Sequence, residues 1–549
     1  MAMIGIDLGT TNTLCSYWLD SDDVPKLIPI SQSTLLSRDS PIEAKALLPS
    51  VVYTPKSGVA FVGEKFKTMS WGATQNQRDH YFSSMKKYMG TSYVREVNGE
   101  LWSPERVAAC LLKYVREQAE FHLREPITRT IITIPASFNT EQRSATLRAA
   151  QIASMPGVIL IDEPTAALCY QMLMAPYFDY KHPNVLMMLD IGGGTFDVSI
   201  IKVQQLDNGR ELSILGQSRY NEMAGDDFDL YIAGYLLARL EQQNSVSFSS
   251  LKQQDQLVLA AYLLYSSEEA KRALSDQVQR LNNDILARDF DKTFVALPPI
   301  NMPEVLQQTK EDLGKFSVSD LIVALHGILP RNSTNENNPL AKPILEALDS
   351  AREVLGEEFG FHDLSNIFLT GGSAYLPILP RQFARVVGRP LKVVSKPMEA
   401  VALGASVFGR WHSRSTTEPV VLRQRLFESI YLQTKTGFVE LLSKNQIIPV
   451  ENHRCVLQGL NTGKQGRRRM AIRLFLGRSP TDALMKPMDT RYIEFDDLLP
   501  GNTPIEIDIS VSINRTFELK FIAGGKTASL SVDHGRPNTI TDKLPQVLT

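Results

Sequence analysis

A strand–turn motif that occurs twice constrains this chain more than any other feature. In the first copy, residues 4–13 (IGIDLGTTNT), an apolar stretch ends in Asp7 and is followed by a glycine and two hydroxyl residues. A buried strand with such a turn directs backbone N–H groups and hydroxyls at one point, which suits phosphate oxygens. The acid would repel phosphate directly, but it can hold Mg²⁺ through water. Taken alone, the motif also fits an ordinary hairpin turn.

The second copy lies at residues 185–200 (VLMMLDIGGGTFDVSI), where an apolar stretch ends in Asp190 and runs into three glycines and a threonine. Two such turns far apart in the sequence are not the short-period repeat of a solenoid. They favour a duplicated α/β domain in which two lobes hold one nucleotide between them.

Composition narrows the class of protein. A chain of 549 residues is long enough for more than one domain, and its net charge of −2 gives no reason to expect a nucleic-acid or membrane partner. The four cysteines lack CxxC spacing, which predicts reduced thiols rather than disulfides or a zinc site. Neither a signal peptide nor an apolar run of membrane-spanning length is evident. We therefore expect a cytoplasmic protein.

Local patterns place the predicted elements. Asn98-Gly99 predicts a tight hairpin, Ser103-Pro104-Glu105 predicts the start of a helix, and a further helix is expected to follow Asn139. Residues 130–134 form a β-branched strand, and residues 158–161 form another that delivers Glu163 at its carboxyl end. Alternating strands and helices predict parallel pairing, with ligands beyond the carboxyl ends of the strands. Glu163 is therefore a candidate for a role near the nucleotide.

The last part of the chain has a different pattern. Residues 410–427 are rich in Ser, Thr, Pro and charge, which is typical of a linker, and the short alternating apolar runs after them predict a β-sandwich. We assign residues 1–412 to the nucleotide-binding domain, 413–426 to the linker and 427–549 to the β-domain. We interpret Arg467-Arg468-Arg469 as a solvated hairpin tip rather than a nucleic-acid site.

The chain also resembles a known family, the seventy-kilodalton heat-shock chaperones of the DnaK type. Ten runs match in the family's order: GIDLGTTNT, LPSVV, MKKYMG, TIPASFNTEQRSAT, IDEPTAA, DIGGGTFDVSI, AGDDFD, EEAKRALS, LTGGSAYLP and EAVALGASV. They extend over roughly residues 4–408. The resemblance implies an α/β actin-like two-lobed ATPase domain followed by an all-β sandwich domain.

Residue roles are implied by the resemblance position by position. The phosphate loops comprise Gly9, Thr10, Thr11, Asn12, Gly192, Gly193, Gly194 and Thr195. The adenosine side comprises Gly225, Glu268, Lys271, Arg272, Ser275, Gly371, Gly372, Ser373 and Tyr375. The acids that hold Mg²⁺ through water are Asp7 and Asp190, and the catalytic set is Lys86, Glu163, Asp190 and Thr195. Pro135 and Arg143 are implied to relay the nucleotide state to the next domain.

Several positions depart from the family pattern. Tyr375 stands where an arginine usually stacks on adenine, and an aromatic ring can stack there too. Ile159 replaces an arginine that meets the J-domain of a co-chaperone, and in the linker Arg423 interrupts the apolar run while Gln424 replaces an aspartate. These changes leave open whether a J-domain protein stimulates the chain.

Three weaker expectations concern the β-domain and one loop of the ATPase half. Residues 435–438 are expected to face bound peptide, and the polar run 332–338 (NSTNENN) of the ATPase half is expected to be a solvated loop. After Val532 we expect only a short polar tail and no counterpart of the family's helical lid.

The resemblance implies an ATP-dependent chaperone that binds and releases unfolded or extended polypeptide under control of ATP hydrolysis. The implied cofactors are ATP or ADP and Mg²⁺, with K⁺ as a further candidate, and the implied partners are a J-domain co-chaperone and a nucleotide exchange factor. Three alternatives stay open: an actin-like assembly ATPase, a small-molecule kinase on the same fold, and a regulatory ATPase that has lost coupling to peptide.

Overall fold

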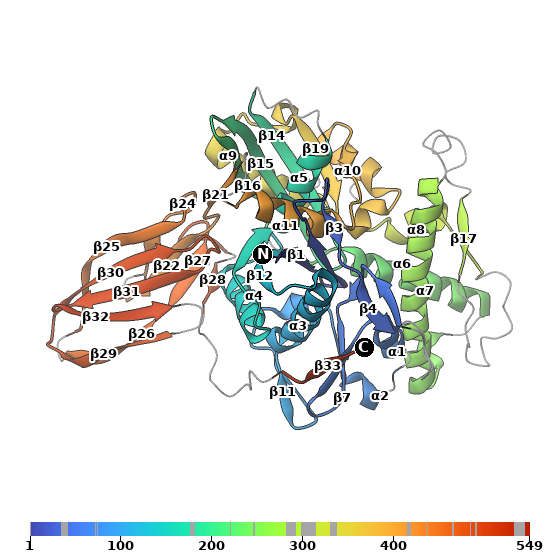
Figure 1. Ribbon diagram of the computed structural model, residues 1–549, viewed down its shortest axis with the longest axis horizontal. Helices are drawn as coiled ribbons and strands as arrows, with labels where there is room; N and C mark the ends of the chain where they lie inside the picture. The colour runs from blue at the N-terminus through green and yellow to red at the C-terminus, as the bar shows by residue number, and fades with distance from the viewer. Residues whose placement is uncertain are drawn as a thin grey trace.

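Figure 1 shows the architecture of the protein in a computed structural model. The structure describes residues 2–33, 42–71, 73, 75–175, 182–219, 221–244, 247–280, 293–297, 314–329, 337–413, 419–435, 437–463, 466–483, 485–488, 491–531 and 544–549. Two α/β lobes lie together on one side, and a β-rich domain extends from them on the other. The predicted loop residues 332–336, residues 414–418 of the predicted linker and Thr436 lie outside the described residues.

Lobe I is built on a sheet with the strand order β13-β12-β1-β2-β3, and β6 also pairs with β2. β1 and β2 form an antiparallel hairpin, while β12 pairs with β1 and β13 with β12 in parallel. The strands span Ala2–Leu8 (β1), Asn12–Tyr17 (β2), Lys26–Leu27 (β3), Leu48–Pro49 (β6), Ile127–Ile134 (β12) and Val158–Asp162 (β13).

Lobe II repeats this arrangement in the order β20-β19-β14-β15-β16. β14 and β15 form an antiparallel hairpin, and β19 pairs with β14 in parallel, as β12 does with β1. The strands span Asn184–Ile191 (β14), Phe196–Leu206 (β15), Gly209–Gln217 (β16), Asn366–Thr370 (β19) and Lys392–Val393 (β20). The matching topology confirms the duplication that the two turns predict.

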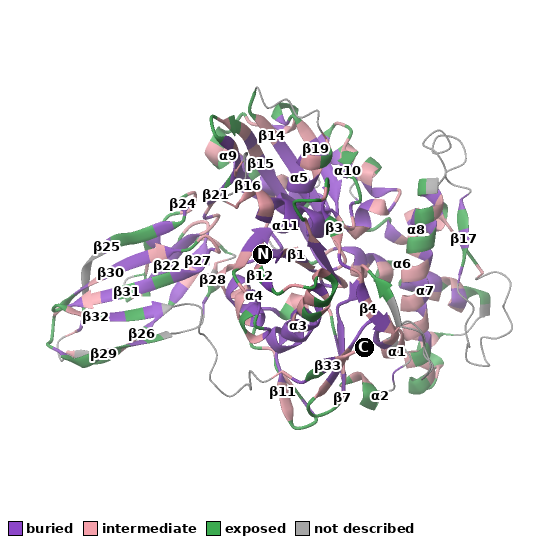
Figure 2. Ribbon diagram, in the orientation of Figure 1, coloured by how far each residue is buried: buried purple, intermediate pink, exposed green. Residues whose placement is uncertain are grey.

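Two helices pack between the sheets. α5 (Glu163–Met174) and α11 (Ala400–Trp411) contact each other so closely that a Cβ on Gly404 would lie 1.7 Å from the Ala166 carbonyl oxygen. Small residues on both helices allow this approach. Buried apolar residues surround the pair and continue into the cores of both lobes, as Figure 2 shows for the central strands.

The other helices cover the sheets, and two predicted local signals are confirmed there. The Ser103 side chain caps α3 by accepting a hydrogen bond from the Arg106 N–H. Asn139 caps α4 through a reciprocal capping box with Gln142. The helices span Glu64–Trp71 (α1), Gln75–Arg78 (α2), Met85–Tyr88 (η1), Pro104–Leu123 (α3), Thr140–Ile152 (α4), Gly225–Asn244 (α6), Phe248–Ser250 (η2), Gln253–Arg280 (α7), Val318–Leu325 (α8), Lys342–Leu355 (α9), Phe361–Asp363 (η6), Gly372–Tyr375 (η7) and Leu379–Val387 (α10).

Short strands complete the two lobes. The predicted hairpin is confirmed, because Asn98 and Gly99 take φ values of 54° and 74° between its strands. These strands span Ile30–Ser33 (β4), Ile42–Lys45 (β5), Val51–Lys56 (β7), Val59–Val62 (β8), Tyr81–Ser83 (β9), Arg95–Val97 (β10), Glu100–Trp102 (β11), Phe294–Ala296 (β17) and Lys315–Ser317 (β18).

The β-domain has its own core of buried apolar residues between the sheets β23-β22-β27-β28 and β25-β30-β31-β32, with the β26–β29 ribbon beside them. The strands span Ser429–Thr434 (β22), Gly437–Leu442 (β23), Val450–Asn461 (β25), Arg467–Ile472 (β26), Leu474–Gly477 (β27), Lys486–Pro487 (β28), Arg491–Leu499 (β29), Pro504–Val511 (β30), Phe517–Ala523 (β31) and Lys526–Ser531 (β32). Ile447–Ile448 (β24), between β23 and β25 in the chain, is the last strand of the lobe II sheet instead.

The structure differs from the predicted domain plan in two places. Residues 420–425 of the predicted linker form a strand, β21, that pairs with β16 of lobe II, because their apolar side chains at alternate positions are buried there. The final residues are not a polar tail of the β-domain. Gln546–Leu548 (β33) pairs with β8 of lobe I, where Val547 enters the core.

The arginine run also differs from its predicted place at a hairpin tip. Arg467 to Arg469 lie at the start of β26, where Arg468 forms an ion pair with Glu494 and Arg469 stacks over Tyr492. Ionic and aromatic partners within the ribbon therefore account for Arg468 and Arg469.

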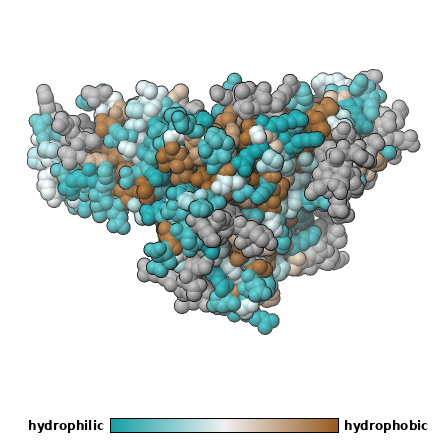
Figure 3. Space-filling model, turned by 90° about the horizontal axis from the view of Figure 1, so that it is seen from above, coloured by the Kyte–Doolittle hydropathy of each residue, from teal (hydrophilic) through white to brown (hydrophobic). Residues whose placement is uncertain are grey.

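The four cysteines are unpaired and buried, in agreement with the prediction of free thiols. On the face seen in Figure 3, hydrophobic residues form groups separated by hydrophilic ones. Within the described part of the chain, no helix is both long and apolar enough to cross a membrane.

Candidate nucleotide site

A cavity of about 370 Å³ lies between the two lobes, which is within the ~300–1,000 Å³ typical of small-molecule sites. Every residue predicted to bind phosphate, adenosine or Mg²⁺, and every predicted catalytic residue, lines this cavity. Pro135 and Arg143 are not among the lining residues. The structure thus gathers residues from both copies of the motif and from distant helices around one space.

The two turns meet face to face in this cavity. A Cβ on Gly193 would lie 2.0 Å from Thr11 Oγ1, and a Cβ on Gly194 would lie 2.5 Å from Thr10 Cγ2. The hydroxyl residues of the first turn therefore occupy space that side chains on the second turn would need. Gly371 lines a third side of the cavity. Its φ of +86° favours glycine, and a Cβ there would lie 2.6 Å from Asp190 Oδ1.

Two acids, the half-buried Asp7 and the buried Asp190, are the candidates for holding a cation. Burial, reinforced by the charge of Glu163, raises the pKa of Asp7 to about 7, although Lys86 and Thr133 act in the opposite direction. Burial and the neighbouring acids also raise the pKa of Asp190, whose Oδ2 is buried without a hydrogen-bond partner. An ion between them would relieve this repulsion, so the acids fit Mg²⁺.

The acids are not arranged as a direct ligand cluster. Among the described residues, no group of three or more His, Cys, Asp or Glu side chains has the geometry of a metal site.

Lys86 and Glu163 form a buried ion pair beside the two acids. Burial alone would lower the pKa of Lys86, but the charges of Glu163 and Asp7 outweigh it and the pKa is raised. The lysine is thus held as a cation. η1 carries Lys86, and α5 carries Glu163 in its first turn, directly after β13.

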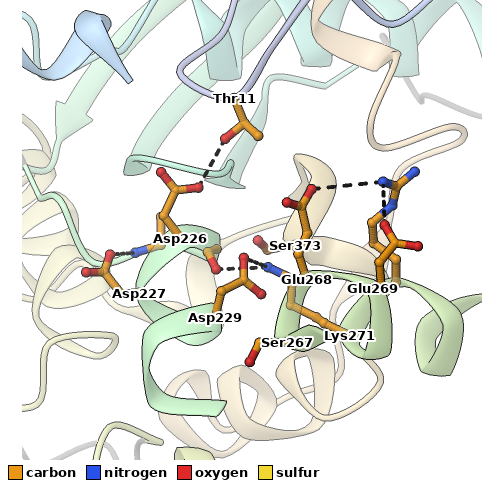
Figure 4. Close-up of polar contacts among 12 residues, drawn as sticks. Thr11, Asp226, Asp227, Asp229, Ser267, Glu268, Glu269, Lys271 and Ser373 are labelled. Atoms are coloured by element: carbon orange, nitrogen blue, oxygen red, sulfur yellow. Dashed lines mark hydrogen bonds and ion pairs between the residues drawn. The ribbon is translucent and has the colours of Figure 1, made fainter. Parts of the chain in front are cut away.

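The opposite wall is formed by α6 and α7, as Figure 4 shows. Lys271 donates to Asp229 at 2.7 Å and to the Gly225 carbonyl at 2.9 Å, which joins the two helices. Thr11 of the first turn donates to Asp226 Oδ1 at 3.1 Å and so connects lobe I to α6.

An ion pair spans the mouth of the cavity between the lobes. Lys67 of α1 lies 2.6 Å from Glu268 of α7, and Arg272 lies 3.9 Å from the same carboxylate. Arg272, whose side chain is about half exposed, and the half-buried Tyr375 both line the cavity. The planar guanidinium and the aromatic ring offer flat surfaces suited to an adenine ring.

Arg143 lies behind the cavity in a buried network at the base of the β-domain. Its guanidinium is 2.7 Å from Asp162 Oδ1, and Asp162 directly precedes Glu163. On the other side, Arg515 of the β30–β31 turn donates to Asp162 Oδ2 at 3.2 Å and to Gln424 of β21 at 2.7 Å. Burial lowers the pKa of Arg515 to about 9 although Asp162 acts to raise it. Pro135 immediately follows β12 in the same region.

Further contacts join the β-domain to the lobes, among them the ion pair of Lys444 with Glu353 of α9 at 3.0 Å. Asn514 accepts from the Leu160 N–H at 3.0 Å, and Arg219 of lobe II donates to Asp482 at 2.8 Å. The residues of this interface come from lobe I, lobe II, the linker strand and the β-domain, so a movement of either lobe would change it.

Sequence reasoning missed several residues of the site. Lys67, Asp226 and Asp229 line the cavity, and each makes an ion pair there. The run AGDDFD contains both acids, so it offered a signal for them, whereas nothing around Lys67 distinguishes it from a surface lysine. Arg515 had no signal, because its partners are distant in the sequence.

Comparisons with known proteins agree with this geometry. The family model described as Hsp70 protein matches residues 3–294 and 331–489. A chaperone protein DnaK from Thermosipho melanesiensis is 29% identical over 486 residues, which are 88% of this chain and 71% of the relative.

Proposed function

The chain belongs to the Hsp70 family, whose members bind and hydrolyse ATP with Mg²⁺, and from that premise we propose that it is an ATP-dependent chaperone. The β-domain would bind unfolded or extended polypeptide, and hydrolysis in the cavity between the lobes would control release. J-domain and exchange-factor partners and a cytoplasmic location belong to the same proposal, on the strength of the DnaK relative.

The residues of the cavity support hydrolysis by water. Backbone N–H groups of the two turns would hold the phosphates, and Thr10 and Thr195 would add hydroxyl donors, while the Thr11 hydroxyl donates to Asp226. Mg²⁺, when bound, supplies charge neutralisation on the phosphates, and Asp7 and Asp190 would hold it through water. Lys86 would stabilise the charge that develops on the terminal phosphate, while Glu163 would orient the attacking water.

The observation that carries the chaperone proposal is the contact of Arg515 with Asp162, which adjoins Glu163. A side chain of the β-domain thereby contacts lobe I, the linker strand and Gln217 of lobe II at once. A rotation of one lobe against the other would break one of these hydrogen bonds. Nucleotide state and peptide affinity are then linked through the same contacts.

The peptide site itself rests on the resemblance. Lys435 and Gly437 lie at the β22–β23 turn, and the Phe438 ring contacts Phe475 edge-on at 4.8 Å between centroids. An extended peptide would dock there through main-chain hydrogen bonds and apolar side-chain contacts.

The test is the off-rate of a dye-labelled apolar peptide from the full chain in ADP and after addition of ATP. We expect ATP to speed release at least about tenfold, or ~1.4 kcal/mol if it is carried wholly into affinity. Arg515→Ala should leave binding in ADP intact and abolish the acceleration, because the contact with Asp162 is lost. Lys520→Ala, on an exposed position of β31, is the matched control.

A separate pair of variants tests the assignment of the hydrolysis site. Lys86→Ala should reduce phosphate release by about 100-fold or more, whereas its neighbour Lys87→Ala should change it much less, since Lys87 is not among the residues that line the cavity. Peptide binding that ignores ATP would indicate a regulatory ATPase without coupling. Absence of peptide binding together with nucleotide-dependent sedimentation would indicate an assembly ATPase.

A further inference from the structure

β33 lies in lobe I, although the strands that precede it belong to the β-domain (Figure 1). It pairs in parallel with β8, with Val547 opposite Ala60, and the Gln546 N–H donates to the Gly58 carbonyl at 3.0 Å. β8 pairs with β7 on its other side, so β33 covers what would otherwise be an edge of this sheet.

Apolar side chains anchor the segment. Val547 is only 7% exposed and belongs to the core of lobe I, and Leu544 packs partly buried against the same core. Lys113 of α3 donates to the Pro545 carbonyl at 3.5 Å, while Gln546 points outward and is exposed. Backbone pairing combined with alternate buried side chains is the usual mode of strand addition.

This pairing connects the β-domain to the ATPase lobes a second time. Before the β-domain, β21 lies in the sheet of lobe II, and after it, β33 lies in the smaller β33-β8-β7-β9 sheet of lobe I. The thirteen steps from Ser531 to Leu544 span at most about 45 Å, at ~3.5 Å per residue. While β33 stays paired, the β-domain cannot move farther from lobe I than this length allows.

We propose that residues 544–549, the latch segment, hold the β-domain against the ATPase lobes by adding a strand to β8, and that release of this segment permits the domain to separate. The partner of the β8 edge is thus an extended segment of the same chain. A connection this short gives an effective concentration in the millimolar range, so even weak pairing keeps the segment bound in cis. The inference concerns the domain arrangement and holds whether or not the β-domain binds peptide.

The first experiment compares Val547→Asp with Gln546→Ser in the full chain. The aspartate would place a charge in the core of lobe I, while the serine replaces an exposed side chain on the same strand. In hydrogen exchange, Val547→Asp should speed exchange of the β8 amides at least about tenfold. Gln546→Ser should leave it unchanged.

Domain separation is measured by small-angle X-ray scattering in ADP, in a background of Arg515→Ala and Asp482→Ala that weakens the docking interface. Val547→Asp should increase the radius of gyration beyond that of this background alone, because both attachments are then weakened. Unchanged β8 exchange would overturn the pairing. Faster exchange without an increase in the radius of gyration would overturn the holding role.

An engineered disulfide between β33 and β8 provides a second test if Val547→Asp does not fold. Gln546 of β33 is paired with Val59 of β8, so the double variant Gln546→Cys and Val59→Cys places two cysteines opposite each other. The ~4.8 Å between neighbouring strands suits a disulfide. Together with Val547→Ala in the background of Arg515→Ala and Asp482→Ala, the oxidised chain should be compact and the reduced chain extended. Equal radii in the two redox states would overturn the proposal.

Discussion

The two phosphate turns are copies of one motif, yet they contribute opposite kinds of surface to the cavity. The β1–β2 turn presents Thr10, Thr11 and Asn12 after a single glycine, whereas the β14–β15 turn presents three glycines before its one hydroxyl residue, Thr195. Gly193 and Gly194 have no room for a Cβ because Thr11 and Thr10 occupy that space. The copies have thus become complementary: side chains on one require bare backbone on the other.

The acids at the ends of the two strands differ in the same way. Asp7 Oδ1 accepts from the Thr133 hydroxyl at 3.3 Å, while Asp190 Oδ2 is buried without a hydrogen-bond partner. The duplicated turn therefore supplies two acids in similar positions but with different needs for a cation. Duplication preserved the backbone, and the contact between the lobes set the chemistry of each copy.

The largest effect is expected for Gly194→Ala. The new Cβ would meet the Thr10 side chain at about 2.5 Å, and displacing the first turn by an ångström should lower ATP affinity at least ~100-fold. Calorimetry of ATP binding measures it. Thr10→Ser in the same chain removes only Cγ2 and should recover little of the loss, because Thr10 Oγ1 at 2.6 Å and Cβ at 2.7 Å still crowd the new Cβ.

The control for that prediction is Gly234→Ala on α6, where nothing lies within 4 Å of the new Cβ. It should leave ATP affinity unchanged and raise the free energy of unfolding by up to ~1 kcal/mol. Wild-type affinity in Gly194→Ala would show that the turns are not complementary in solution.

A smaller effect is expected from the acids. Asp190→Asn should reduce the Mg²⁺-dependent part of ATP affinity about 10- to 100-fold, and Asp7→Asn should reduce it less, since Thr133 still partners that side chain. Titration of ATP binding with Mg²⁺ and with EDTA separates the metal-dependent part. Equal losses in EDTA would mean that the acids act without the ion.

The smallest effect is expected for Thr11→Val, which keeps the shape but removes the hydroxyl that donates to Asp226 at 3.1 Å. Loss of one hydrogen bond of ~0.5–1.5 kcal/mol corresponds to a roughly 2- to 13-fold change in nucleotide affinity. Stopped-flow release of a fluorescent ADP measures the change, and Thr11→Ser is the matched control. A larger loss for Thr11→Ser than for Thr11→Val would contradict the hydrogen-bond account.

The features that could be predicted from the sequence are those whose residues are neighbours along the chain. The strand–turn motifs around Asp7 and Asp190, the hairpin at Asn98-Gly99 and the caps at Ser103 and Asn139 all rest on short-range geometry. The family resemblance added the residues of α7 and η7, because EEAKRALS and LTGGSAYLP are local runs as well.

The remaining features depend on contacts between residues far apart in the sequence. Lys67 meets Glu268, Arg515 meets Asp162, and Val547 enters a core built by the first part of the chain. The side chains of these pairs are common ones in unremarkable local patterns, so no periodicity or turn signal marks them. These contacts form only when the lobes and the β-domain pack against one another, because burial and charge pairing depend on distance in space rather than on separation along the chain.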